Sequence, residues 1–273
     1  MKMKSLFITT IACFVFMQNV EAQFLKKLGD RVKQKVENTI VEKTANEAAE
    51  KTSKSMDKVF DSNPFGSGKK LMADPAAVAS VYDFSWKYSL KMTTSSKEGE
   101  MFFDYYLEPD ASYFGFASPT MANMFTVMDN GKKVIVMFMQ SQGNKAGMVT
   151  SMPDDMDSEG SADELAKFTF QQLPEKTING YHCKGVKATN NEMEMVMYFT
   201  NEAEVTFDDF FKNQNQQTKI PIQLKDYFKP GDKVLMISMD MKGLKDKNMD
   251  ARIECVGLEK VSMTLKKSDY KFM

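Results

Sequence analysis

Few side chains in this sequence have the type and spacing that catalysis or metal binding requires. His182 is the single histidine in the chain, so it could serve one catalytic triad at most and no histidine-rich zinc site. The patterns GxSxG and HExxH, which mark common hydrolases, are absent from the sequence. The residues therefore predict a protein that is not an enzyme and that needs no cofactor and no metal.

Methionine is unusually frequent, with 24 residues in the chain. Met193, Met195 and Met197 alternate along one expected strand, and Met239 follows Ile237 with the same spacing on another. Because methionine is flexible and apolar, such clusters either fill an ordinary core or form a deformable wall for a ligand. Thioethers also select Cu(I), but no His or Cys accompanies these clusters, which disfavours copper. The sequence does not decide between the two remaining interpretations, an ordinary core and a wall for a ligand.

The cysteines allow two interpretations. Cys183 and Cys255 lie in strand-like segments, whereas Cys13 lies in a segment that we expect to be removed. In an oxidising compartment Cys183 and Cys255 are a candidate disulfide. Alternatively, each packs as a small buried apolar side chain. Neither has another cysteine two or three residues away, so their spacing does not indicate a metal site.

Residues 1–22 have the composition of a cleavable export signal peptide. Lys2 and Lys4 precede the apolar stretch 6–17, which is too short to span a bilayer as a helix. The segment 20–22 (Val-Glu-Ala) fits the small-residue cleavage pattern, so the mature chain is expected to begin at Gln23. The sequence therefore predicts a periplasmic or secreted protein.

The part that follows the signal divides into a helix, a linker and a domain. Residues 23–60 are rich in Lys, Glu and Ala and contain no Pro, which predicts a long, amphipathic, charged helix. Such a helix either binds an anionic membrane surface or stays solvated through its interspersed acidic residues. Residues 61–78 contain two Pro and two Gly and predict a linker, which leaves 79–273 as the folded domain.

Charge argues against one class of partner. Lys and Arg number 36 against 37 Asp and Glu, which gives a net charge of −1. A balanced chain has no basic field to attract phosphates, so the composition predicts no nucleic-acid partner.

Strand patterns dominate from residue 79 onward. Apolar and polar residues alternate at every position from Tyr82 to Met92, as in a half-buried strand. The same reasoning predicts strands at 101–107, 112–117, 125–128, 133–139, 168–173, 181–188, 193–200, 234–241, 251–258 and 261–266.

Turn and helix signals complete the pattern. Asn130-Gly131 predicts a tight hairpin turn, and Asn179-Gly180 is expected within a longer loop. Short helices are expected after the capping box at Ser161 and from Thr206 to about residue 216. The predicted fold class is α+β: a curved, mostly antiparallel sheet in the form of a half-barrel, with short covering helices and the long N-terminal helix.

Two segments of this domain resemble a known family. Residues 127–137 (VMDNGKKVIVM) and 176–185 (KTINGYHCKG) are similar to paired hairpin signatures of domain-of-unknown-function family 4412. The sequence departs from that family after Phe199, where a tryptophan-containing strand is expected. The resemblance implies an envelope domain related in fold to the outer-membrane lipoprotein carriers, whose curved sheet encloses an apolar cavity for acyl chains. It implies no catalytic residues.

Alternate side chains of each strand in a curved sheet point toward its concave face. The residues expected to line an apolar cavity there lie on the apolar side of their strands: Phe84, Trp86, Tyr88, Met195, Met197, Ile237 and Met239. The expected function is non-enzymatic binding of an apolar or lipid-like ligand in the envelope, where another envelope protein or a membrane surface is a further candidate partner. The alternative is a structural or protein-interaction module with a solid core, which acts through its N-terminal helix.

Overall fold

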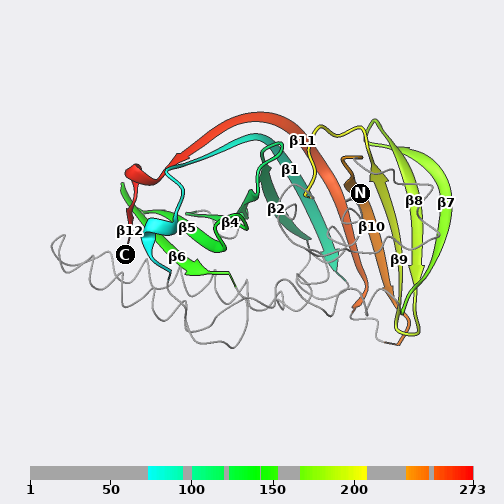
Figure 1. Ribbon diagram of the computed structural model, residues 1–273. Coiled ribbons are helices and arrows are strands. Elements are labelled where there is room, and N and C mark those ends of the chain that lie inside the picture. Colours follow the sequence, from blue (N-terminus) through cyan, green and yellow to red (C-terminus); the bar gives the residue numbers. More distant parts are fainter. Residues whose placement is uncertain are drawn as a thin grey trace, which may run out of the picture. The chain divides into compact units, whose positions relative to one another are not determined.

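The domain is built on one sheet of twelve strands, of which Figure 1 shows the curvature. The computed structural model describes residues 73–94, 100–119, 123–141, 143–152, 167–207, 232–245 and 249–272. The predicted signal peptide, the helix 23–60 and most of the linker 61–78 lie outside these ranges, as do the helix expected after Ser161 and nearly all of the one expected from Thr206. Within the described ranges, no helix is long and apolar enough to cross a bilayer.

The strands follow the predicted pattern closely. Their bounds are β1 Val81–Thr94, β2 Glu100–Leu107, β3 Tyr113–Ala117, β4 Met124–Asp129, β5 Val134–Ser141, β6 Asn144–Ser151, β7 Thr169–Ile178, β8 Tyr181–Thr189, β9 Met193–Thr200, β10 Leu235–Gly243, β11 Ala251–Lys266 and β12 Lys271–Phe272. Two short 3₁₀ helices are present: η1 (Pro75–Ala77) precedes β1, and η6 (Lys267–Asp269) lies between β11 and β12.

The sheet order is β12-β6-β5-β4-β3-β2-β1-β11-β10-β9-β8-β7. Neighbours in the chain are mostly hairpin partners, but β1 pairs with β11, so the two longest strands lie side by side in the middle of the sheet (Figure 1). Every pair is antiparallel except β12 with β6, where Lys271 and Phe272 pair in parallel with Ala146 and Gly147. The predicted curved and mostly antiparallel sheet is therefore confirmed.

Some strands differ from the prediction. The strand predicted at 168–173 continues to Ile178 as β7. The strands expected at 251–258 and 261–266 form the single strand β11, because register shifts opposite β1 absorb the break in the apolar pattern. Strand β6 was not predicted, since its Gly147, Met148 and Val149 are consecutively buried and the alternation of a half-exposed strand is missing.

The two Asn-Gly turns also differ from expectation. Asn179 (φ 51°) and Gly180 (φ 85°) form the tight turn, with Ile178 directly paired to Tyr181. In the β4–β5 connection the positive φ belongs to Lys133 (55°) instead of Asn130 or Gly131. Here side chains set the turn, because the Lys132 amide donates to Asp129 Oδ1 (3.0 Å).

One buried cluster lies where the ends of β1 and β11 pack on β4, β5 and β6. Its buried members are Val78, Tyr82, Phe84, Val127, Val134, Val136, Phe138, Val149 and Leu265. Gly147 lies under the ring of Phe272, where a Cβ would come within 2.5 Å of that ring. The lack of a side chain at Gly147 is what lets β12 lie against β6.

Candidate functional site

The methionines of β9 and β10 form one continuous group. The register pairs Met197 with Met239 and Met195 with Met241, and directly opposed residues of antiparallel strands lie on the same face. All four are at most 5% exposed. We call these four residues the methionine patch.

The patch belongs to a longer row of apolar side chains that crosses six strands in register. From β2 to β8 the row consists of Met101, Met92, Ile253, Met239, Met197 and Val186. Ala188 and Ala251 stand opposite Met195 and Met241 in the neighbouring row. The patch is therefore bordered by shorter side chains on both sides.

The structure does not bring all of the predicted cavity residues together. Tyr88 pairs with Tyr105, whereas the ring of Phe84 contacts Tyr106 (6.1 Å between centroids). Because adjacent residues of β2 point to opposite faces, Phe84 and Tyr88 contact opposite faces of that strand. The apolar side chains of β1 change from one face of the sheet to the other at the register shift between Phe84 and Trp86. The sequence pattern alone did not reveal this shift.

The remaining predicted residues have the following places. Trp86 is half-buried, with the Lys260 amino group 5.1 Å from the centroid of its ring. Ile237 is fully buried and lies at the register shift between Met236 and Ser238. The Tyr88 hydroxyl donates to the carbonyl oxygen of Met236. Of the seven predicted residues, Met195, Met197 and Met239 are the ones that the strand pairing places side by side.

The two cysteines lie near the tip of the β7–β8 hairpin, where it reaches β11. The Asn179 side chain donates to the carbonyl oxygen of Cys255 (2.6 Å). Both thiols are free and buried, and each donates to a carbonyl of its own strand, Cys183 to Tyr181 (3.3 Å) and Cys255 to Gly257 (3.5 Å). Burial, followed by Glu202 and the nearby Cys255 thiol, raises the pKa of Cys183 from 9.0 to about 11. A disulfide between them after oxidation stays a prediction.

His182 has a surface role. Its Nε2 lies 2.9 Å from Glu175 Oε2, with both side chains about half exposed, and its backbone amide donates to Glu202 (2.9 Å). In the part of the chain that the structure describes, no three His, Cys, Asp or Glu side chains are gathered as a metal ion would require.

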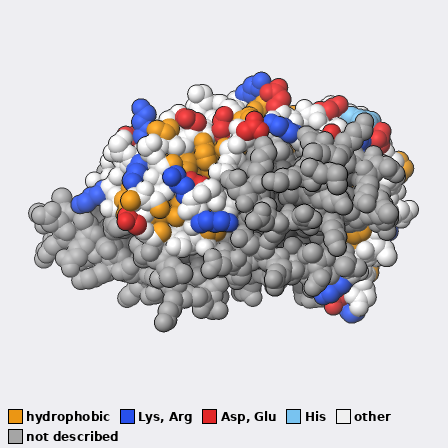
Figure 2. Space-filling model, viewed as in Figure 1, with side chains coloured by type: hydrophobic (Ala, Val, Ile, Leu, Met, Phe, Trp, Pro, Cys, Tyr) orange, Lys and Arg blue, Asp and Glu red, His pale blue; other side chains and the backbone are white. Residues whose placement is uncertain are grey.

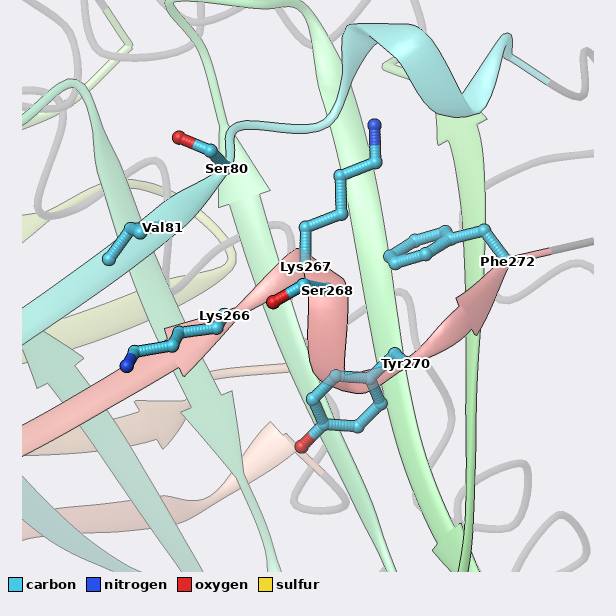
Figure 3. A pocket seen from close by; sticks show the side chains of 7 residues that line it. All are labelled: Ser80, Val81, Lys266, Lys267, Ser268, Tyr270 and Phe272. Atoms are coloured by element: carbon cyan, nitrogen blue, oxygen red, sulfur yellow. The ribbon is translucent and has the colours of Figure 1, made fainter.

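Two hollows open on the surface of the sheet. One of about 480 Å³ lies between the β7–β8 tip and β11, and its lining includes Lys91, Asn179, Tyr181 and Glu254. The other, of about 550 Å³, lies where β1 begins and β11 ends (Figure 3) and is lined by Ser80, Val81, Lys266, Lys267, Ser268, Tyr270 and Phe272. We call the second one the terminal hollow. Sequence reasoning missed it because its two segments lie at opposite ends of the domain.

The chain belongs to the family described as a domain of unknown function (DUF4412), whose model matches residues 87–264. The predicted family is therefore confirmed. Comparison with curated proteins gives no match. The family description assigns no activity, so a function has to be argued from the geometry of this chain.

Several solved structures are similar over most of the chain. They include PNGF-II (11% identity, TM-score 0.33, 70% of this chain and 31% of that one) and an uncharacterized conserved protein from Thermus thermophilus (12%, 0.36, 72% and 92%). A LolA superfamily protein from Nitrosomonas europaea is also similar (6%, 0.25, 66% and 87%). The chain spans about a third of the length of PNGF-II.

Proposed function

We propose that this chain is a non-enzymatic protein, exported to the cell envelope, that binds an apolar or lipid-like ligand against the methionine patch. The observation that carries the proposal is the register that sets Met197 beside Met239 and Met195 beside Met241. Unbranched thioether side chains adapt to partners of varied shape. A plain core is more often filled by branched residues with well-defined rotamers.

The surroundings of the patch support a binding role. Ala188 and Ala251 stand opposite Met195 and Met241, so long flexible side chains alternate with short ones across the sheet. Methionines beside alanines can change rotamer with few clashes, which is what accommodating an acyl chain would require. The export signal expected at 1–22 supports an envelope location for this binding.

A second candidate function has its own observation. Met197 and Ile237 are completely buried, as residues of a solid core are. In that case the domain is a structural or protein-interaction module, and the segment 23–60 makes the contacts. The two candidates differ in what a charge at Met197 would do.

The test compares Met197→Asp with Val196→Asp, its neighbour on the opposite face, which stands between Lys187 of β8 and Asp240 of β10. Binding is measured with diphenylhexatriene, an uncharged apolar fluorescent probe, and stability by thermal melting. The ligand-binding proposal expects wild type and Val196→Asp to bind the probe, and Met197→Asp to lose binding yet melt cooperatively, at a cost below about 2 kcal/mol because an open site lets the carboxylate keep water.

The solid-core alternative expects the reverse. A carboxylate without a partner in a packed interior would lower the free energy of unfolding by about 4 kcal/mol or more. Wild type without probe binding, together with loss of the melting transition in Met197→Asp, would reject the ligand-binding proposal. Native mass spectrometry of the purified full chain gives an independent readout, since a bound lipid adds its own mass.

A further inference from the structure

The terminal hollow combines apolar walls with positive charge. Figure 3 shows the rings of Tyr270 and Phe272 on one side and Ser80 and Val81 on the other. Val81 is 39% exposed, which is high for a branched apolar residue in a strand. The volume of the hollow, about 550 Å³, is in the range of small-molecule sites.

The apolar wall is held in place by the core. The ring of Phe138, which is buried, makes edge contacts with Tyr270 (4.8 Å between centroids) and with Phe272 (5.9 Å). The Phe272 ring also covers Gly147 of β6. The two rings therefore need not be ordered when a ligand arrives, and preorganised walls bind at lower entropic cost.

Positive charge surrounds this wall. The Lys267 amino group donates to the carbonyl oxygen of Pro75 (2.6 Å) and lies 6.0 Å from the centroid of the Phe272 ring, so this charge is fixed in position. The Lys145 amino group lies 5.3 Å from the centroid of the Tyr270 ring. Lys266 is exposed and pairs across the strands with Val81. Figure 2 shows hydrophobic, basic and acidic side chains intermingled in the same part of the surface.

We propose that the terminal hollow binds a single-chain anionic amphiphile, a fatty-acid carboxylate. The alkyl chain would lie against Val81, Tyr270 and Phe272, and the carboxylate would face Lys266. Lys267 and Lys145 attract the anion without contacting it, because a local excess of positive charge raises the concentration of negative ligands. This site is separate from the methionine patch and does not depend on the function proposed for it.

Charge complementarity decides in favour of this occupant. A neutral apolar ligand would gain nothing from the three lysines, and a small inorganic anion would gain nothing from the aromatic wall. Asp269 follows the lining residue Ser268 and accepts a hydrogen bond from the Ser268 hydroxyl (3.5 Å). A ligand with one charged end and one alkyl chain uses both parts of the surface.

The test uses the full chain and titrates laurate, below its micelle concentration, by isothermal calorimetry. Lys266→Gln is compared with Lys260→Gln, which removes the same charge from another exposed position of β11. We expect Lys266→Gln to weaken laurate binding about fivefold, the effect of losing one exposed ion pair, and Lys260→Gln to bind as wild type does. Dodecanol, which has the same chain length without the charge, should bind more weakly than laurate.

A second variant tests the apolar contact. Val81→Asp places a negative charge at the expected position of the ligand, so laurate binding should fall more than about tenfold. The proposal is overturned if laurate does not bind to wild type, if Val81→Asp binds laurate as wild type does, or if both lysine variants lose affinity equally. It is also overturned if Met197→Asp abolishes laurate binding while Val81→Asp retains it, because the ligand would then occupy the methionine patch.

Discussion

The hydroxyl of Tyr82 on β1 donates a hydrogen bond of 3.0 Å to Oδ2 of Asp129 at the end of β4, and both residues are buried. The same hydroxyl accepts a bond from the Ala79 amide (3.3 Å), while Oδ1 of Asp129 accepts one from the Lys132 amide (3.0 Å). A carboxylate inside a protein needs such donors, because an unpartnered buried charge is costly. Tyr82 thus ties the start of the domain to the β4–β5 turn.

Tyr82→Phe should lower the free energy of unfolding by about 1–3 kcal/mol, because Asp129 stays buried with one donor fewer. Tyr113→Phe is the matched control, since its hydroxyl donates to the Asp83 carbonyl (3.1 Å) and accepts from the Asp83 amide (3.2 Å) at an exposed position. Its loss should cost less than about 1 kcal/mol, because water replaces the bond. Urea denaturation measures both, and equal losses would contradict the role assigned to Asp129.

Alkaline pH should destabilise the fold through buried tyrosines. Burial, followed by the charge of Asp129, raises the pKa of Tyr82 above its ordinary value of 10.0, and burial raises the pKa of Tyr88 well above the same value. The unfolded chain then loses these protons first, so stability is unaffected by them below pH 9 and falls as pH rises past about 10. Tyr82→Phe should reduce the slope with which the free energy of unfolding falls above pH 10, by up to about 1.4 kcal/mol per pH unit. Urea midpoints between pH 8 and 11 give the slopes, and identical slopes would refute the prediction.

The buried thiols should react slowly in the folded protein. Burial raises the pKa of both cysteines, that of Cys183 to about 11. At pH 8 this leaves Cys183 about a hundredfold less thiolate than an ordinary cysteine has. Iodoacetamide labelling followed by mass spectrometry should therefore be far slower for the native chain than for the chain unfolded in guanidinium.

The same measurement tests the candidate disulfide. The chain used begins at Gln23 and so lacks Cys13. After treatment with a disulfide oxidant, this chain should take up no label when unfolded if Cys183 and Cys255 are joined, and two labels after reduction. Two labels without reduction would leave them as packing residues. Cys255→Ala provides the single-thiol reference.

The start of the domain should lie before Ala79, the residue at which the sequence pattern placed it. The Ala73 amide donates to the Val149 carbonyl (3.2 Å), Pro75 accepts the bond from Lys267, and Val78 is buried in the main cluster. A chain that begins at Ala73 should therefore be more stable than one that begins at Ala79, by about 2–3 kcal/mol from Val78 burial and the lost hydrogen bonds. Urea unfolding of the two chains compares them, and equal midpoints would show that residues 73–78 add nothing.

Strand positions could be predicted because alternation is a local signal. The strand 193–200 was predicted with its observed bounds, since Met193, Met195 and Met197 recur at every second position. Strand β12 could not be found in this way, because two residues carry no period and their pairing with Ala146 and Gly147 is a tertiary event.

The candidate site was predictable within each strand but not between strands. Alternation placed Met195 and Met197 on one face, but only the pairing of β9 with β10 shows that Met239 and Met241 stand opposite them. Alternation fails for Phe84 and Tyr88, because the register shift between them does not interrupt the apolar and polar pattern of the sequence. The terminal hollow required the pairing of β1 with β11 to be known.

That central pairing also determines the order in which the sheet can be completed. Thr264 on β11 and Asp83 on β1 share a hydrogen bond across 181 positions of sequence. The hairpins β1–β2, β3–β4 and β5–β6 need only short loops and can form early, whereas the pairing of β1 with β11 waits for almost the whole chain. Until β11 arrives, one edge of β1 keeps unpaired backbone groups, and such an edge invites association with other chains. Folding of this protein should therefore be most vulnerable to aggregation, and most dependent on chaperones, just before its last strands emerge.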